Sequence, residues 1–324
     1  MATTRIWDKD NEHVLAFKRS VAGNQSCLPL VKYMLSSLIG LATYPKRIMK
    51  TNYTLIGDVR EKLKELPDKS IQMCVTSPPY FNLRDYDNQE NQLGLEKTPE
   101  EFVENLVEVF AEVHRVLRDD GTLWLNLGDT YLKNKQLGFI PQKVAIALQE
   151  WGWILRQDII WAKKNCMPES VKDRFTKNHE YIFLLSKQPK YFFNQIREPA
   201  TQVSIDRSKR KMNFRKITPD KTVYDEAQDP SRVVAADHMR NKRSVWNMRT
   251  ASYKEAHFAV FPPELAETCI KAGSNEKDIV LDCFMGSGTT AMVAQDLFRK
   301  WIGIELNPEY EKLIRKRTSQ QVLF

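Results

Sequence analysis

The chain has 324 residues, of which 42% are hydrophobic, and it carries a formal net charge of +8 at pH 7 with a pI near 9.1. This length suffices for one large domain, or for one domain with an inserted lobe, and the basic balance favours an anionic partner. Five cysteines lie scattered without a C-x-x-C spacing, which argues against a disulfide framework and a zinc site and fits a reducing cytoplasm: Cys27, Cys74, Cys166, Cys269 and Cys283.

Residues 1–48 carry the weakest pattern. They are polar at first and apolar over residues 27–44, where Pro29 and Lys32 interrupt the run. That stretch is too short and too broken for a membrane span, and acidic residues among the basic ones before it argue against a signal peptide. Two interpretations stay open, an accessory helix packed on the main domain or a dispensable extension that ends before Met49.

A short strand is expected at Tyr53–Ile56, followed by Gly57-Asp58 and a helical stretch in which Asp58 can cap the first turn. The next apolar run, residues 71–75, is typical of a buried strand and leads directly into Thr76-Ser77-Pro78-Pro79-Tyr80. Strand ends are where ligands bind in α/β sheets, so this loop is a candidate site.

The segment Ser77-Pro78-Pro79-Tyr80 has the composition of a clamp for a flat amine. Two adjacent prolines fix their φ angles and donate no backbone N–H, which leaves their carbonyls as preorganised acceptors. Ser77 and the Pro78 carbonyl can accept from an exocyclic NH₂, while Tyr80 can stack on the ring that carries it. A structural Pro-Pro turn is the alternative, and only residues further along the chain argue against it.

Residues 81–95 are rich in aromatic, Asn and Gln side chains and are typical of a mobile lid. A helix is expected from Pro99, with Thr98 as its cap and an apolar stripe that continues to Leu117.

Three strands and one helix are expected between residues 120 and 190. The strands are 122–127, 154–161 and 180–185, and the helix is 139–151. Asn126 and Asp129 should lie near the same sheet edge as Ser77, where they can hold that loop.

From residue 200 to 250 the apolar periodicity disappears. Residues 201–249 hold 12 Lys or Arg against 6 Asp or Glu, an excess that makes up most of the net charge. Amide and aromatic side chains interleaved with the cations favour a DNA-reading lobe over a flexible basic loop. The expected DNA contacts are Lys209, Arg210, Lys211, Arg215 and Arg243.

The segment from Asp282 to Thr290 follows the apolar run 279–281 and precedes a helical run, so it is predicted to be a strand, a glycine loop and a helix start. It lacks G-x-G-x-x-G spacing and a Gly-Lys-Ser/Thr, which argues against dinucleotide and phosphate-cradling loops. A second strand, 301–304, ends at Glu305, whose carboxylate can accept from both hydroxyls of a ribose. The ligand is expected to be nucleoside-like.

With both segments placed, residues 52–317 resemble the S-adenosylmethionine-dependent DNA amino-methyltransferases, which modify N4 of cytosine or N6 of adenine. In that family Ser/Asp/Asn-Pro-Pro-aromatic is the catalytic segment, here Ser77 to Tyr80. Phe-x-Gly-x-Gly is the cofactor loop, here Phe284, Gly286 and Gly288. The order, with the catalytic segment first, resembles the circularly permuted β group of restriction-modification type.

The resemblance implies a doubly wound, Rossmann-like α/β fold with a mixed seven-stranded sheet and S-adenosyl-L-methionine as cofactor. It also implies that Asp58 faces the adenine, that Phe261 lies near the methionine end, and that Asp282 belongs to the cofactor site. The implied domains are an N-terminal extension (1–48), a catalytic half (49–195), a target-recognition lobe (196–250) and a cofactor-binding half (251–324).

The resemblance further implies methyl transfer to N4 of cytosine, because family members with Ser before Pro-Pro mostly modify cytosine, with adenine N6 as the alternative. The expected partners are double-stranded DNA and a cognate restriction endonuclease, with no membrane, and the protein is expected to be a cytoplasmic monomer or homodimer. No metal is needed, and no Pro-Cys dipeptide is present to attack cytosine C5. A non-enzymatic DNA-binding module and an RNA or protein methyltransferase acting on a planar amide stay open.

Overall fold

The protein is described from a computed structural model, which covers residues 49–83, 92–208, 238–251 and 261–319. The predictions for residues 1–48, for most of the lid, and for Lys209, Arg210, Lys211 and Arg215 lie outside these residues.

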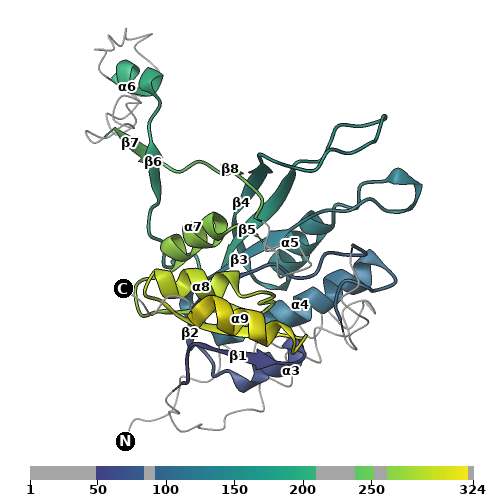
Figure 1. The fold of residues 1–324 in the computed structure, drawn as a ribbon, viewed down its shortest axis with the longest axis vertical. Coiled ribbons are helices and arrows are strands. Elements are labelled where there is room, and N and C mark those ends of the chain that lie inside the picture. The colour runs from purple at the N-terminus through teal and green to yellow at the C-terminus, as the bar shows by residue number, and fades with distance from the viewer. Residues whose placement is uncertain (1–48, 84–91, 209–237, 252–260, 320–324) are drawn as a thin grey trace, which may run out of the picture. The chain divides into compact units, whose positions relative to one another are not determined.

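An eight-stranded mixed sheet organises the described chain, in the order β1-β10-β9-β2-β3-β5-β4-β8 (Figure 1). Its strands are β1 (Tyr53–Ile56), β2 (Ile71–Thr76), β3 (Leu117–Leu127), β4 (Ile154–Lys163), β5 (His179–Ser186), β8 (Val245–Met248), β9 (Ile279–Asp282) and β10 (Lys300–Glu305). Neighbouring strands from β1 to β3 are parallel, and β5 runs antiparallel to both β3 and β4. The predicted α/β fold with a mixed sheet is therefore confirmed.

The sheet has one strand more than the seven predicted. β8 pairs with β4 in parallel, and its side chains alternate between exposed and buried, with Trp246 and Met248 turned into the core. Four alternating residues directly after a long basic stretch give too short a pattern to be read as a strand from the sequence.

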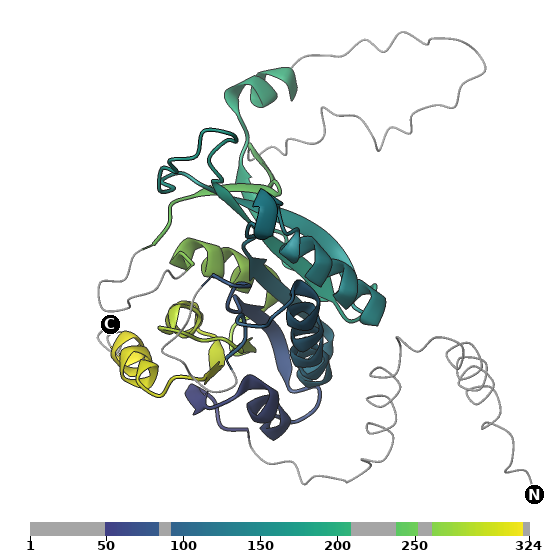
Figure 2. The same cartoon turned by 90° about the vertical axis from the view of Figure 1, so that its right-hand side faces the viewer.

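Helices cover both faces of the sheet. Figure 2 shows α4 and α5 on one face and α7, α8 and α9 on the other. The helices of the main domain are α3 (Val59–Lys62), α4 (Pro99–Val116), α5 (Ile140–Trp151), α7 (Pro263–Gly273), α8 (Thr289–Asp296) and α9 (Tyr310–Ser319). Two short 3-10 turns, η2 (Leu63–Glu65) and η3 (Lys133–Lys135), complete the connections. None of the helices in the described ranges is both long enough and apolar enough to cross a membrane.

The predicted stripe of α4 is its buried face. Phe102, Leu106, Val109 and Phe110 are fully buried, and the Thr98 hydroxyl accepts from Glu101 N at 3.2 Å, as expected for a cap. Burial of such a stripe is the main source of stability for an amphipathic helix, because helices of this length are only marginally stable in isolation.

A small antiparallel pair lies outside the main sheet. β6 (Arg197–Pro199) pairs with β7 (Met239–Asn241), and α6 (Gln202–Ser208) follows β6. These elements fall inside the predicted recognition lobe, whose central part is not described. β8, also within the range 196–250, belongs instead to the main sheet.

The register of the parallel strands brings the candidate loops to one edge. Cys74 of β2 lies beside Leu281 of β9, and Ile56 of β1 lies beside Glu305 of β10. Parallel strands present their carboxyl ends together, so the loop after β2, the glycine loop after β9 and Glu305 meet there.

Candidate active site

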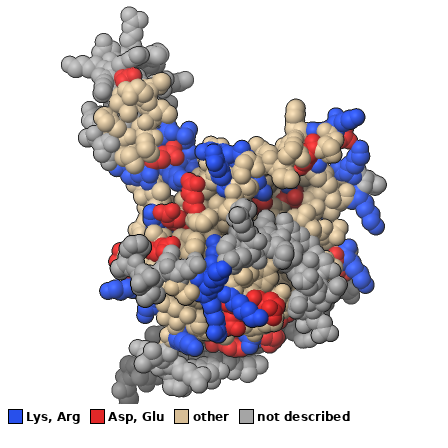
Figure 3. Space-filling view, in the orientation of Figure 1, with Lys and Arg blue, Asp and Glu red and all other residues tan. Residues whose placement is uncertain are grey.

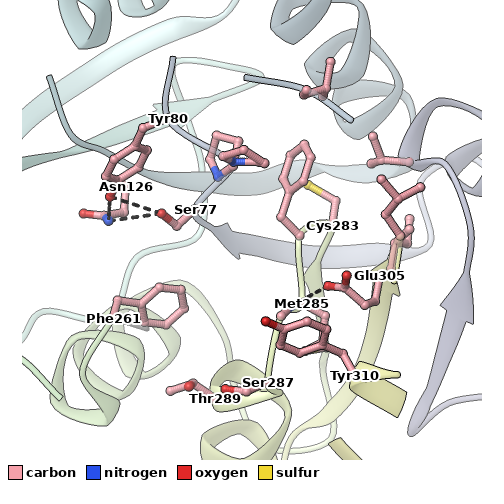
Figure 4. Close-up of a pocket in the computed structure, with 18 of the residues that line it drawn as sticks. Ser77, Tyr80, Asn126, Phe261, Cys283, Met285, Ser287, Thr289, Glu305 and Tyr310 are labelled. Atoms are coloured by element: carbon pink, nitrogen blue, oxygen red, sulfur yellow. Dashed lines mark hydrogen bonds between the residues drawn. The ribbon is translucent and has the colours of Figure 1, made fainter. Parts of the chain in front are cut away.

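A cavity of about 340 Å³ opens at this edge of the sheet (Figure 4). The predicted residues that line it are Ser77, Pro78, Pro79, Tyr80, Asp58, Phe261, Phe284, Gly286 and Glu305. Two predicted site residues, Asp282 and Gly288, are not among the lining residues. The candidate amine clamp and the candidate nucleoside site therefore share one space.

The loop after β2 is held by polar contacts from β3. Asn126 donates from Nδ2 to the Tyr80 hydroxyl at 2.8 Å and to the Ser77 hydroxyl at 3.2 Å, as the dashed lines of Figure 4 show. Ser77 donates in turn to the Tyr80 hydroxyl oxygen at 3.3 Å. These contacts are the ones expected if Asn126 holds the loop. Asp129 instead accepts from the backbone N–H groups of Thr130 and of Ile140, the first residue of α5.

The same loop is joined to β5 through a carboxylate. The Tyr80 hydroxyl donates to Glu180 Oε2 at 2.7 Å, and Asn126 Nδ2 lies 3.0 Å from the same oxygen. The amide has two protons, so at any moment it donates to two of its three acceptors, Ser77, Tyr80 and Glu180. Lys163, at the end of β4, forms an ion pair with Glu180 Oε1. The side chain of Glu180 is only 12% exposed, so the pair sits in a partly desolvated position that strengthens its attraction.

The glycine loop is closed by Glu305. Gly286 N donates to Glu305 Oε2 at 2.7 Å, and Asn307 N donates to Oε1 at 2.9 Å. Burial raises the pKa of Glu305, although the two backbone hydrogen bonds act in the opposite direction. Gly286 has φ +51, a left-handed backbone that glycine adopts without a steric penalty.

Asp282 lies beneath the glycine loop, where it is 1% exposed. Its carboxylate accepts from Thr76 Oγ1 at 2.6 Å, from Thr290 Oγ1 at 2.5 Å and from Phe284 N at 3.1 Å. Burial raises the pKa of Asp282. The residue links the end of β2 to the loop after β9, so its contact with a cofactor stays a prediction.

Asp58 lines the cavity and also starts α3. It accepts from Arg60 N at 2.8 Å and pairs with the Arg60 guanidinium at 2.6 Å. Burial works to raise its pKa, but the hydrogen bonds from Arg60 outweigh burial and lower it. The helix-cap and ligand-binding interpretations of Asp58 are therefore compatible.

The lining fits a nucleoside that carries no phosphate. Among the described residues around the cavity, Lys163 is the single lysine or arginine, and its ammonium is paired with Glu180. Aromatic side chains of Phe261, Phe284 and Tyr310 share the lining with the carboxylate of Glu305, a set suited to a flat ring and to ribose hydroxyls.

Of the predicted DNA contacts, only Arg243 is described. Its side chain is 66% exposed and pairs with Glu198 Oε1 at 2.8 Å, an oxygen that also accepts from Arg240 at 3.0 Å. On the face shown in Figure 3, basic and acidic side chains are interspersed beside β6 and β7. The DNA-binding role of this region stays a prediction.

Sequence reasoning missed Lys163 and Glu180 as members of the site. They stand at facing ends of β4 and β5, where Trp161 lies opposite Glu180 in the antiparallel register. The available signal was a lysine two residues after the predicted strand 154–161 and a glutamate at the first position of the predicted strand 180–185. Tyr310, at the start of α9, was also missed.

Residues 71–316 match the family model described as DNA methylase, the N6/N4 methyltransferase family. The chain is 41% identical to Type II methyltransferase M.SmaI of Serratia marcescens, over 81% of this chain and 89% of that protein. It is also 41% identical to Type II methyltransferase M.XycI of Xanthomonas campestris pv. cyanopsidis, over 86% of this chain and 91% of that protein.

Two solved structures share the fold. The PvuII DNA methyltransferase (cytosine-N4-specific) superimposes with a TM-score of 0.62 at 21% identity, covering 85% of this chain and 89% of that one. The protein TTHA0409 of Thermus thermophilus, solved in complex with S-adenosyl-L-methionine, gives a TM-score of 0.55 at 26% identity, covering 83% of this chain and 94% of that one.

Proposed function

This chain belongs to the N6/N4 DNA methylase family, and from that premise we propose that it methylates the exocyclic N4 of cytosine in double-stranded DNA as part of a restriction-modification system. The methyl donor is S-adenosyl-L-methionine. The single observation that carries the proposal is that Ser77 and the Glu305-closed glycine loop face one cavity, which would bring an amine acceptor and a nucleoside site together.

The cofactor supplies a methyl group activated by a positively charged sulfur. Glu305 would hold the ribose hydroxyls of the cofactor, and Asp58 would lie at its adenine. The backbone of Phe284 and Gly286 would lie beside the rest of the cofactor. The cofactor fits this cavity because carboxylates and aromatic rings line it. Among the described lining residues, no unpaired cation is present to bind a phosphate.

The base would enter between Ser77 and Tyr80 after leaving the DNA stack. The Ser77 hydroxyl donates a hydrogen bond to Tyr80 and can accept one from Asn126. A second lone pair of its oxygen is left to accept from an amine N–H. Together with the Pro78 carbonyl, this acceptor would turn the nitrogen lone pair toward the methyl group, and the rate gain would come mainly from positioning.

Cytosine is proposed over adenine because the residue before Pro78 is Ser77, not Asp. A hydroxyl is a weaker acceptor than a carboxylate, and either can serve both bases, so the experiment must identify the product. DNA methylated by the purified protein is digested to nucleosides and analysed by mass spectrometry. N4-methylcytosine is expected, and N6-methyladenine in its place would overturn the assignment of the base.

The residue order supports a circular permutation, since β2 and the Ser77 loop precede β9 and the glycine loop in the chain. We assign target recognition to the region 196–250, which carries the basic excess. The two relatives at 41% identity are named Type II methyltransferases, which supports a cognate endonuclease that cuts the same sequence. DNA modified by this protein should resist that endonuclease.

A further inference from the structure

Three side chains of the site form a hydrogen-bonded chain that runs in one direction. The Ser77 hydroxyl donates to the Tyr80 oxygen, and the Tyr80 hydroxyl donates to Glu180 Oε2. Resting on the proposed function, we propose that Glu180 is the proton acceptor of methyl transfer and that Ser77 and Tyr80 carry the amine proton to it.

Each hydroxyl of this chain donates its one proton to the next member. Tyr80 oxygen accepts from Ser77 and from Asn126, and its single proton goes to Glu180. The Asn126 amide must turn its NH₂ toward these atoms, because its oxygen would repel the Glu180 carboxylate. Ser77 is the first member of the chain and lines the cavity, and in the proposed complex its Oγ accepts from the amine N–H.

The carboxylate is placed to receive a proton at the moment the amine releases one. Its Oε1 is held by Lys163, and Oε2 collects the bonds from Tyr80 and Asn126. Lys177, just before β5, and His179, the first residue of β5, each have an electrostatic interaction with Glu180. A carboxylate that is ion-paired with one lysine and connected to the reacting group by hydroxyls has the geometry of a proton relay.

The proposed step balances. The amine nitrogen forms a bond to the methyl carbon, and the carbon–sulfur bond breaks with its electron pair remaining on sulfur. An N–H bond of the amine then breaks, its proton passes to Ser77 Oγ, the Ser77 proton passes to Tyr80, and the Tyr80 proton passes to Glu180. The products are a neutral methylated amine, both hydroxyls restored and a protonated Glu180.

Two substitutions separate this relay from simple packing. Glu180→Gln keeps the shape and the contact with Tyr80 but removes the proton acceptor. Tyr80→Phe keeps the ring and removes the hydroxyl in the middle of the chain. The matched control is Glu169→Gln, because Glu169 is a glutamate ion-paired with Arg174 in the β4–β5 loop and is not among the residues lining the cavity.

Single-turnover methylation of target DNA is measured against pH for the wild type and the three variants. Glu180→Gln and Tyr80→Phe should each slow the transfer about 10²-fold or more, within the range of general base catalysis, and Glu169→Gln should not. The pH profile of the rate should differ between the wild type and Glu180→Gln, because the variant lacks the carboxylate that accepts the proton. Folding is checked by thermal melting.

Two binding measurements test the role without relying on turnover. Affinity for S-adenosylhomocysteine by calorimetry and base extrusion, reported by 2-aminopurine placed beside the target base, should match the wild type in Glu180→Gln and Tyr80→Phe. A wild-type rate in Glu180→Gln would overturn the relay. The relay would also be overturned if either variant is slow because it extrudes the target base less, or if Glu180→Gln is slow but keeps the wild-type pH profile.

The failure of the relay is distinguishable from failure of the proposed function. If the wild type makes N6-methyladenine, the base assignment fails while the same variants still test the relay, because an exocyclic amine loses its proton in either case. If the wild type transfers no methyl group, both are overturned.

Discussion

The aromatic ring of Tyr80 lies against the backbone of Gly128: a Cβ atom built on Gly128 would stand 2.4 Å from Tyr80 Cε2. The ring is held there because the Tyr80 hydroxyl is bonded to Asn126 and Glu180. Gly128 directly follows β3 and has no left-handed backbone angle, so its value at this position is the space it leaves and not its conformational freedom.

Gly128→Ala should therefore displace the Tyr80 ring and slow methyl transfer. A displacement on the order of 1 Å in a positioned group can cost about 10²-fold in rate. Single-turnover rates measure this, with cofactor affinity as the control that should stay unchanged. In a Tyr80→Ala background the added methyl group has no ring to meet, so Gly128→Ala should have little further effect; an equal effect in both backgrounds would contradict the explanation.

Glu305→Ala should weaken S-adenosyl-L-methionine binding. Loss of a hydrogen bond to a charged group costs about 1.5 to 3 kcal/mol, and the glycine loop loses its contact at Gly286 N as well. Calorimetry measures the affinity, with Glu309→Ala as the control, because that glutamate is exposed and pairs with Lys312. Unchanged affinity in Glu305→Ala would remove this residue from the cofactor site.

Cofactor affinity should also depend on pH through Glu305. Burial raises the pKa of this carboxyl, so on acidification it takes up a proton at a higher pH than an ordinary glutamate. The neutral acid is a weaker acceptor for ribose hydroxyls. Affinity should therefore fall as the pH is lowered through this raised pKa, and calorimetry on Glu305→Gln should show a weaker dependence.

His114 should make the fold sensitive to mild acid. Its ring packs edge-on against Trp151 and Trp153, and burial, aided by nearby Lys187, lowers its pKa to about 4. Between about pH 6.5 and that value the unfolded chain binds more protons than the folded one, so stability is lost as the pH falls.

The loss should be about 2 kcal/mol, which is less than the full shift implies because the ring is partly exposed to solvent. Urea unfolding at several pH values measures it. His114→Phe should remove this part of the pH dependence while retaining the aromatic packing, and an identical pH dependence in that variant would show that other groups cause it.

Replacement of Lys209–Lys211 by alanine should weaken DNA binding and lower its salt dependence. Each lost phosphate contact reduces the slope of log affinity against log salt by about 0.9. A variant with Lys64, Lys271 and Lys312 replaced loses the same charge at exposed, ion-paired positions of other helices. If both variants bind with the same slope, the charge of 209–211 acts through the overall field and not by contact.

Much of the fold could be predicted because its signals are local. Apolar runs marked β2, β9 and β10, and the residues after them identified the Ser77 loop, the glycine loop and Glu305 before their positions were known. Helix α4 followed from its cap and its 3.6-residue stripe. In each case the neighbours that decide the structure lie within a few residues along the chain.

The partners of the site were set by the sheet. Glu180 lies 100 positions from Tyr80, and Thr76 lies 206 positions from Asp282, and neither contact has a spacing that a sequence pattern can report. Placing β5 between β3 and β4 brings Glu180 to Asn126 and Lys163.

The sequence by itself therefore determined which loops lie at the cavity, and it predicted what kind of ligand they suit, since strand, glycine loop and acid follow one another in the chain. The tertiary structure decided which charges stand beside those loops, and it added β8 to the edge of the sheet. The physical reason is that strand order and register align residues far apart in sequence, and only that alignment brings Glu180 to within hydrogen-bonding distance of Tyr80.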